Sequence, residues 1–212
     1  MTGGAQNPST RWWWVRHAPV TSNRGRLYGA SDPPADIDDG EAFAGLAAFL
    51  PSDAVLVCSH LQRTHQTAAA IAAGGLALPT KLVEPDFGEQ NFGDWQGTPY
   101  DQIDRLAAPR LHRFWFTTPD HAPPGGESFA ELSVRVAAAI DRLTRAHAGR
   151  DIIAVAHGGP IRAALAHALG LDFDGAFAFV TDNLSVTRID HVPGPGRGRE
   201  WQVLFANVVP RW

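Results

Sequence analysis

Four residues that could act on a phosphate group lie at the ends of short apolar runs, far apart along the chain. These residues are Arg16, His17, Arg63 and His157. A single histidine at the end of a strand is more often a packing residue than a catalyst. Two arginines and two histidines that converge on one edge of a sheet indicate a functional site instead.

The types of these residues indicate chemistry at phosphorus. Two guanidiniums can bind a dianionic phosphate, because bidentate arginine contacts match its oxygens. A neutral imidazole can attack phosphorus and form a phosphohistidine. A second histidine can donate to the equatorial oxygens and stabilise the charge of the transition state.

Such a reaction also needs a carboxylic acid that protonates the leaving oxygen. The irregular stretch from residue 84 to residue 128 offers four carboxylates, which are Glu84, Asp86, Glu89 and Asp94. The residue types alone leave all four open. We expect this stretch to be an insertion over the active site, because it is rich in proline, glycine and aromatic residues.

The apolar runs read as buried parallel strands that position these residues. The runs are Trp12–Val15, Ala54–Cys58 and Ile152–Ala156, and helical patterns follow the last two at 61–73 and 160–170. Continuous apolar strands followed by helices indicate a parallel sheet covered on both faces. We therefore predict an α/β fold, a three-layer α/β/α sandwich around a mostly parallel central sheet.

The remaining patterns complete this prediction. Amphipathic helices are expected at 40–50 and 128–148, a short strand at 81–84, and two late strands at 184–190 and 200–208 that form a hairpin. We expect a disordered tail over residues 1–10 and a single domain over residues 11–212.

Composition excludes several classes of protein. The formal net charge of −4 does not suggest a nucleic-acid or membrane partner. The only cysteine, Cys58, excludes an internal disulfide framework and a thiolate metal cluster. The N-terminus does not read as a signal peptide, and no apolar run approaches the ~20 residues of a membrane helix. We therefore expect a cytoplasmic protein.

Five segments together resemble the motifs of the histidine phosphatases, the phosphoglycerate mutase-like superfamily. They occur in the family's order and extend over most of the chain: VRHAPVTSNRGR, SHLQRTHQTA, FGEQNFGDWQG, PPGGESFAEL and VAHGGPIRAAL. The resemblance implies that His17 is the nucleophile and that Glu89 is the proton donor, which later activates water. It also implies that four residues bind the phosphoryl group: Arg16, Asn23, Arg63 and His157.

The chain departs from the family pattern just after the nucleophile. Ala18 stands where a glycine is usual, and Pro19 and Val20 stand where an acidic residue and a hydroxyl are common. These changes affect the expected affinity for phosphate rather than the chemistry.

The resemblance favours a phosphatase of a small phosphorylated metabolite, without metal or cofactor. The segment from Glu89 to His157 is short, as in the family's phosphatases, whereas the mutases have a longer one. The aromatic group 114–116 would suit an apolar leaving group, although packing of the insertion explains it equally well. α-Ribazole phosphatases and broad-specificity enzymes are both compatible with the sequence. A mutase, a non-catalytic phospho-ligand binding protein and a homodimer stay open as alternatives.

Two other phosphatase classes fit less well. A cysteine phosphatase needs a cysteine and an arginine separated by five residues, and Cys58 and Arg63 are one residue too close. A metal-dependent enzyme needs clustered ligands, and His60 and His65 lack the spacing that places two histidines on one helix face.

Overall fold

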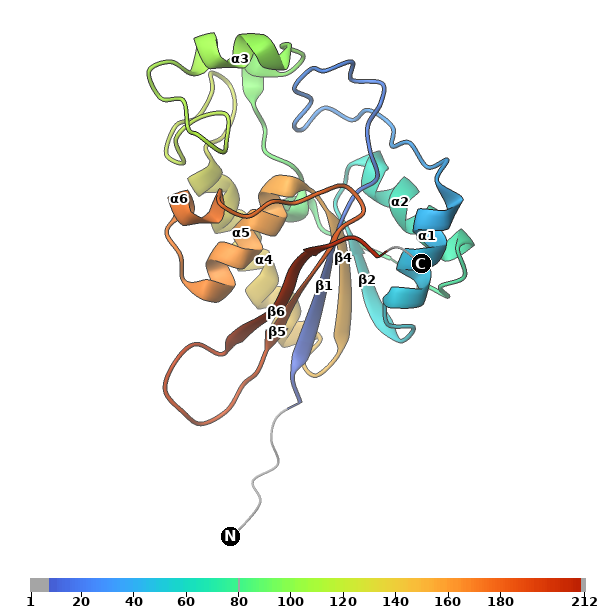
Figure 1. Cartoon of the computed structure of the whole chain (residues 1–212). Helices are drawn as coiled ribbons and strands as arrows, with labels where there is room; N and C mark the ends of the chain where they lie inside the picture. Colours follow the sequence, from blue (N-terminus) through green and yellow to red (C-terminus); the bar gives the residue numbers. More distant parts are fainter. Residues whose placement is uncertain (1–7, 80, 211–212) are drawn as a thin grey trace.

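The computed structural model describes residues 8–79 and 81–210, and its centre is a six-stranded sheet in the order β3-β2-β4-β1-β5-β6 (Figure 1). The strands are β1 (Thr10–Arg16), β2 (Ala54–Cys58), β3 (Leu82–Val83), β4 (Asp151–Ala156), β5 (Val186–His191) and β6 (Trp201–Val208). The first four are parallel, whereas β5 and β6 are antiparallel and form a hairpin. This topology confirms the predicted mostly parallel sheet.

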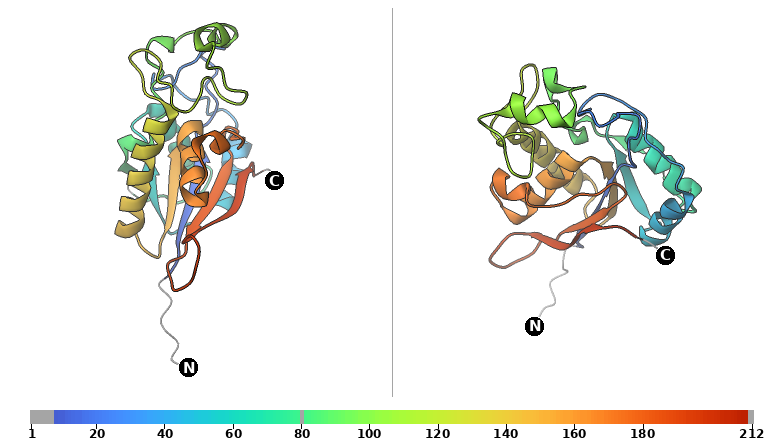
Figure 2. Two further views of the ribbon diagram at one scale, coloured as in Figure 1. Left: turned by 90° about the vertical axis from the view of Figure 1, so that its left-hand side faces the viewer. Right: turned by 45° about the horizontal axis from the view of Figure 1, so that its top comes forward.

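Helices cover both faces of the sheet, as Figures 1 and 2 show. One face carries α1 (Gly40–Phe49) and α2 (Gln62–Ala73), and the other carries α4 (Phe129–Ala146), α5 (Gly158–Leu169) and the short α6 (Phe173–Ala176). The α5 helix ends at Gly170, which has a φ of 65°. Glycine adopts this left-handed conformation without strain, so the predicted helix stop is confirmed. None of the helices within 8–79 and 81–210 is long and apolar enough to cross a membrane.

The tryptophan run shows why β1 lies at the centre of the sheet. Trp12 and Trp14 belong to the core beneath α4 and α5, whereas Trp13 and Val15 pack on the opposite face. This alternation is the period-2 pattern of a strand, and both faces are apolar because helices cover both. Trp12 also donates a hydrogen bond from Nε1 to Thr144 Oγ1 of α4, over 3.0 Å.

Two features differ from the prediction. Thr10, predicted as part of the tail, begins β1, because its backbone pairs with His191 of β5. Residues 1–7 of that predicted tail lie outside the described residues. The insertion is also more regular than expected. It contains two 3-10 turns, Pro85–Phe87 and Gly93–Trp95, and the helix α3 (Tyr100–Ala107).

A separate small core stabilises this insertion above the sheet. It consists of five buried side chains: Leu27, Phe92, Trp95, Ile103 and Ala107. In Figure 1 the insertion and the loop after β1 lie at the end of the sheet where β1, β2 and β4 terminate. Because these strands are parallel, their carboxyl ends meet at one edge, and the space below the insertion is where a ligand site is expected.

Candidate active site

His17 directly follows β1, and the backbone holds it on both sides. Its N–H donates to Ala156 O over 3.0 Å, and its carbonyl accepts a hydrogen bond from Asn183 Nδ2 over 2.7 Å. The side chain is fully buried. Its Nδ1 lies 2.6 Å from Ala18 O, which can only accept, so Nδ1 carries the proton and Nε2 carries the lone pair.

The protonation state of His17 suits a nucleophile. Burial lowers its pKa well below the ordinary value, and the positive charges of Arg63 and Arg16 lower it further. The imidazole is therefore neutral at pH 7. Nε2 is buried and has no hydrogen-bond partner among the described residues.

His157 follows β4 and lies beside His17, with the two ring centroids 5.1 Å apart. Burial lowers its pKa well below the ordinary value, with smaller contributions from Arg63 and His17. Its Nδ1 accepts a hydrogen bond from Arg63 Nε over 3.2 Å, so the neutral ring carries its proton on Nε2. That nitrogen lies 2.8 Å from Ser59 Oγ and donates to it.

Arg63 is fully buried on the first turn of α2. Its Nη1 donates to Ser31 O and its Nη2 to Gly29 O, each over 2.7 Å, and its guanidinium lies 5.1 Å from the centre of the Tyr28 ring. Each Nη nitrogen carries two protons, so one N–H on each is left for a ligand. The loop after β1 thus fixes Arg63 in place before any ligand arrives.

Arg16, the last residue of β1, donates from Nη1 to Thr181 O. Its Nε and the hydroxyl of Thr181 are both buried without a hydrogen-bond partner in the described part of the chain. Buried polar groups are rarely left unpaired, and those that are often mark a binding site. Both groups lie near Gly158: a methyl added there would be 3.8 Å from Arg16 Nε and 3.2 Å from Thr181 Oγ1.

Of the four carboxylates that the sequence left open, the structure favours Glu89. Glu84 is buried in an ion pair with Arg142, at 2.7 Å, and neither Asp86 nor Asp94 is among the residues that line the main cavity. Glu89 lines this cavity.

Backbone groups hold the Glu89 carboxylate at the start of α5. Its Oε1 accepts from Gly159 N over 3.1 Å and from Gln90 N over 3.0 Å. A methyl added at Gly159 would lie 2.5 Å from Oε1, so a glycine at this position leaves room for the carboxylate.

Asn23 is the predicted residue that the structure does not bring to the group. Its Nδ2 donates to Arg26 O over 2.8 Å within its own loop, and it is not among the residues that line the cavity. Its role as a phosphoryl ligand stays a prediction.

The departures at Ala18 and Pro19 are accommodated by the backbone. Ala18 N donates to Thr67 Oγ1 over 2.9 Å, and Pro19 O accepts from Asp36 N over 2.7 Å.

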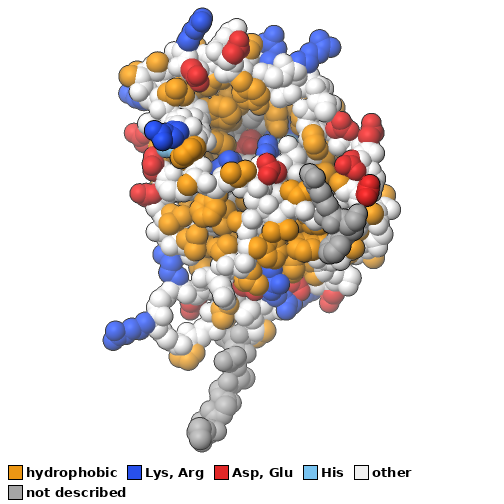
Figure 3. Space-filling model, in the orientation of Figure 1, with side chains coloured by type: hydrophobic (Ala, Val, Ile, Leu, Met, Phe, Trp, Pro, Cys, Tyr) orange, Lys and Arg blue, Asp and Glu red, His pale blue; other side chains and the backbone are white. Residues whose placement is uncertain are grey.

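The main cavity opens next to these groups and has a volume of about 590 Å³. Arg16, Glu89 and Gly158 line one part of it, and the insertion supplies most of the rest: Phe92, Tyr100, Ile103, Asp104, Leu111, His112, Arg113, Phe114, Trp115 and Phe116. Figure 3 shows a hollow with hydrophobic side chains on this face, below the segment that carries α3. His17 and His157 are fully buried beside Arg16 and Gly158 rather than exposed in the cavity.

The aromatic group of the insertion packs against the rest of the fold and also lines the cavity. Trp115 packs on Phe177 with ring centroids 5.4 Å apart, and Phe116 packs on Phe92 at 5.2 Å. Phe114 is 57% exposed. Because all three also line the cavity, the packing that holds the insertion in place also builds an apolar wall there.

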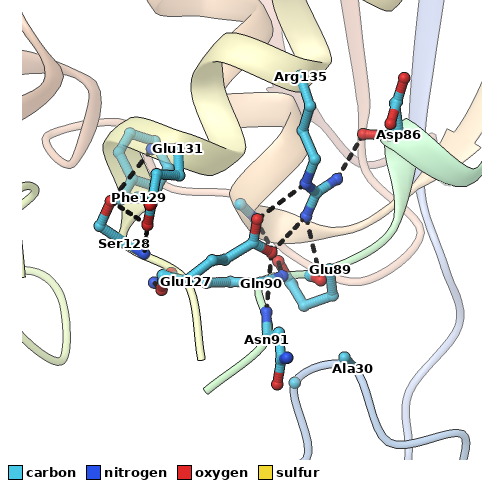
Figure 4. Close-up of polar contacts among 12 residues, drawn as sticks. Ala30, Asp86, Glu89, Gln90, Asn91, Glu127, Ser128, Phe129, Glu131 and Arg135 are labelled. Carbon is cyan, nitrogen blue, oxygen red and sulfur yellow. Dashed lines mark hydrogen bonds and ion pairs between the residues drawn. The ribbon is translucent and has the colours of Figure 1, made fainter. Parts of the chain in front are cut away.

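Arg135 of α4 fixes the backbone that carries Glu89, as Figure 4 shows. Its Nε and Nη2 contact the two carboxylate oxygens of Glu127 at 3.0 and 2.6 Å, while further N–H groups donate to the carbonyls of Asp86 and Glu89. Glu127 in turn accepts from Asn91 N over 3.0 Å. The backbone on both sides of Glu89 is therefore tied to α4.

We expect Arg135→Met to lower stability and turnover together. The Arg135 and Glu127 side chains are only 23% and 21% exposed, so the loss of one partner leaves a half-buried carboxylate unpaired. The free energy of unfolding should fall by about 2 kcal/mol, measured in urea, and kcat should fall roughly tenfold. Arg145→Met, at an exposed position of the same helix, is the matched control. Equal effects of the two variants would contradict this role.

Several residues of the site carried no signal in the sequence. Arg162 lines the cavity one helical turn after Gly158, Tyr28 packs on Arg63, and Thr181 and Asn183 approach the end of β1 from the loop before β5. The position of Arg162 in HGGPIR, four residues after Gly158, is the one feature that could have indicated it. No three His, Cys, Asp or Glu side chains in residues 8–79 and 81–210 gather in a way that could hold a metal ion.

Comparisons with known proteins agree on one family. The sequence model of the histidine phosphatase superfamily (branch 1) matches residues 12–204. A bifunctional protein of Mycobacterium tuberculosis is 34% identical over 170 residues, which are 78% of this chain and 46% of that protein. The chain thus spans about half the length of this mycobacterial relative.

Other relatives are similar over most of their length. A glucosyl-3-phosphoglycerate phosphatase of Mycolicibacterium vanbaalenii is 31% identical and is matched over 74% of its length, against 76% of this chain. A Yersinia enterocolitica protein named as a probable phosphoglycerate mutase is also 31% identical, over 91% of this chain and 90% of its own. The solved mycobacterial glucosyl-3-phosphoglycerate phosphatase in complex with VO3 has a TM-score of 0.72 and 27% identity. That match covers 93% of this chain and 98% of the solved one.

Proposed function

Because the chain belongs to the histidine phosphatase superfamily, we propose that it is a metal-independent phosphomonoesterase that works through a phosphohistidine at His17. The observation that carries this proposal is the state of His17. It is neutral, its proton is fixed on Nδ1, and its Nε2 lone pair is buried beside Arg16 and Arg63. A group that only bound phosphate would have no need of a lone pair there.

In the first step, Nε2 of His17 forms a bond to phosphorus while the bond to the leaving oxygen breaks. The leaving oxygen takes a proton from Glu89. The phosphorylated ring keeps its proton on Nδ1 and gains positive charge, which the Ala18 carbonyl stabilises from 2.6 Å. In the second step, water attacks phosphorus, gives a proton to the Glu89 carboxylate, and releases inorganic phosphate and neutral His17.

Three residues would stabilise the phosphoryl group during transfer. Arg63 can offer the one free N–H on each Nη nitrogen, and Arg16 can offer its unpaired Nε. His157 has both ring nitrogens engaged, so it would exchange Ser59 for a phosphoryl oxygen and donate to it from Nε2. The donors of Arg63 and Arg16 favour the transition state because they are already in place and need no reorganisation during the reaction.

Hydrolysis is favoured over mutase activity and over simple binding. Relatives with similar folds include phosphatases of a small phosphorylated metabolite, and the stretch from Glu89 to His157 is short. A binding protein would need neither a nucleophile nor an acid. The apolar wall formed by residues 114–116 favours a small organic leaving group.

The test is hydrolysis of 4-nitrophenyl phosphate by the purified chain in excess chelator. We expect turnover to survive the chelator and an acid-labile phosphoryl group to be trapped on the protein during turnover. Loss of activity in chelator, or an acid-stable phosphoprotein, would contradict the proposal. A second assay offers 3-phosphoglycerate with its bisphosphate primer, and free phosphate rather than an isomer is expected.

A further inference from the structure

Arg162 is a cation in the main cavity that the proposed reaction does not use. It lies on α5, is half-buried, and lines the cavity together with Glu89 and Trp115. No carboxylate pairs with it among the salt bridges of the described residues. Glu89 of the same cavity raises the pKa of Arg162 but forms no salt bridge with it, so the half-buried guanidinium is open to an anionic ligand.

The protein holds this guanidinium in one place. Arg162 Nε donates to Phe179 O over 2.9 Å, and its guanidinium carbon lies 4.8 Å from the centre of the Trp115 ring. Trp115 is itself fixed, because its Nε1 donates to Gln90 Oε1 over 3.1 Å and its ring stacks on Phe177. These contacts use Nε and one face of the guanidinium, and no hydrogen bond joins its Nη groups to any residue in 8–79 and 81–210, so these groups can bind a ligand.

Arg162 lies near the groups that are proposed to hold the phosphoryl group and to protonate the leaving oxygen. A methyl added at Gly158 would lie 3.1 Å from Arg162 Nη1 and 3.2 Å from the unpaired Thr181 hydroxyl. Glu89 lies beside the next residue, Gly159, and its role is to protonate the leaving oxygen. Arg162 therefore lies between the groups proposed to hold the phosphoryl group and Trp115 on the cavity wall.

Burial lowers the pKa of Arg162 to about 10, which leaves it charged at neutral pH. The cost of burying that charge falls when an anion binds.

We propose that Arg162, with Thr181, binds a second anionic group on the leaving side of the substrate. The site would then prefer phosphomonoesters that carry another carboxylate or phosphoryl group over those of neutral alcohols. A planar guanidinium binds either group in a bidentate manner. This inference rests on the proposed function, because it assigns the substrate class of the same cavity.

The test compares phosphate release from two matched pairs of substrates. One pair is 3-phosphoglycerate and glycerol 3-phosphate, which differ in a carboxylate, and the other is fructose 1,6-bisphosphate and fructose 6-phosphate. In at least one pair, Arg162→Met should lower kcat/KM for the member with the second anionic group about 10- to 100-fold, mainly through KM. The kcat/KM for the member without it should stay nearly unchanged. The pair that responds identifies the anion as carboxylate or phosphoryl.

Two further variants serve as controls. Arg105→Met removes a positive charge from an exposed position of α3 outside the cavity lining and should leave the preference within each pair unchanged. Arg162→Lys keeps the charge and should recover part of the preference. An equal loss on both members of each pair would overturn the inference, as would no loss on either.

The inference is separable from the proposed function. If the wild-type chain hydrolyses none of these compounds or 4-nitrophenyl phosphate, the proposed function fails. The second-anion site is then tested by calorimetric binding of the same pairs to wild-type and Arg162→Met proteins. If the wild type binds the member with the second anionic group more tightly and the variant loses this difference, the inference is supported. If the wild type binds both members equally, the inference is overturned.

Discussion

Replacement of His17 by alanine is expected to lower kcat for 4-nitrophenyl phosphate at least about 10⁴-fold, because it removes the atom that attacks phosphorus. Arg16, Arg63 and His157 would still bind phosphate, so binding of inorganic phosphate should survive. The acid-labile phosphoryl group should be absent. Steady-state release of 4-nitrophenolate in excess chelator and phosphate binding by calorimetry measure the two expectations.

His17 is fully buried, so its replacement must be separated from a loss of folding. His17→Gln keeps most of the volume and a polar group, and should be as inactive as His17→Ala while unfolding close to the wild-type temperature. His60→Ala is the matched control, because His60 also follows a strand of the same edge but is exposed. We expect it to keep its activity within a few-fold of the wild type. Activity that survives in both His17 variants would refute the proposed nucleophile.

The sheet could be predicted from the sequence because the segments that form its central strands are short and continuously apolar. The run Trp12–Val15 is apolar at every position, as expected of a strand buried on both faces. The positions of His17 and His157 at the same edge then follow from the parallel pairing of β1 with β4, in which Arg16 lies opposite Ala156. The edge of the sheet that carries the site could therefore be predicted without the structure.

The choice of acid could not be made in this way. Glu84, Asp86, Glu89 and Asp94 have similar chemistry, and their roles depend on contacts with distant elements. Glu84 is paired by Arg142 of α4, whereas Glu89 reaches the backbone of α5. The resemblance to the family pointed to Glu89, which is the one of these four that lines the cavity, and its role as the acid stays a prediction.

Asn183 shows a second limit of the sequence. Asn183 lies 166 positions after His17 in the sequence, yet its side chain holds the His17 carbonyl. The segment that carries Asn183 precedes β5, and only the antiparallel pairing of β5 with β1 brings it there. Contacts that depend on such long-range pairing leave no local pattern to read.

The departure from the family pattern after His17 has a structural explanation. Ala18 is fully buried and its backbone N–H is bound by Thr67, so the methyl group is accommodated within the core between β1 and α2. The loop is held by the backbone groups of Ala18 and Pro19. The side chains that differ at Pro19 and Val20 are therefore not needed for its conformation.

Replacement of Glu89 by glutamine should slow turnover about 10²- to 10³-fold and change KM only a few-fold. A glutamine oxygen can still accept from Gly159 N and Gln90 N, so the side chain should keep its place. It cannot give up a proton. The loss should therefore be larger for alkyl phosphates, whose leaving oxygen needs a proton, than for the first step with 4-nitrophenyl phosphate.

This difference provides a sharp test, because Glu89 is proposed to act in both steps. With 4-nitrophenyl phosphate the first step should remain fast, while the water-dependent step, which needs the carboxylate as a base, becomes slow. Stopped-flow measurement should then show a burst of 4-nitrophenolate, and more phosphohistidine should be trapped than in the wild type. Asp86→Asn, the same change at a carboxylate outside the cavity lining, should keep kcat within about twofold and give no burst. An unchanged kcat with a raised KM in Glu89→Gln would contradict the role of acid and base, because it would mean that Glu89 contributes equally to substrate and transition-state binding.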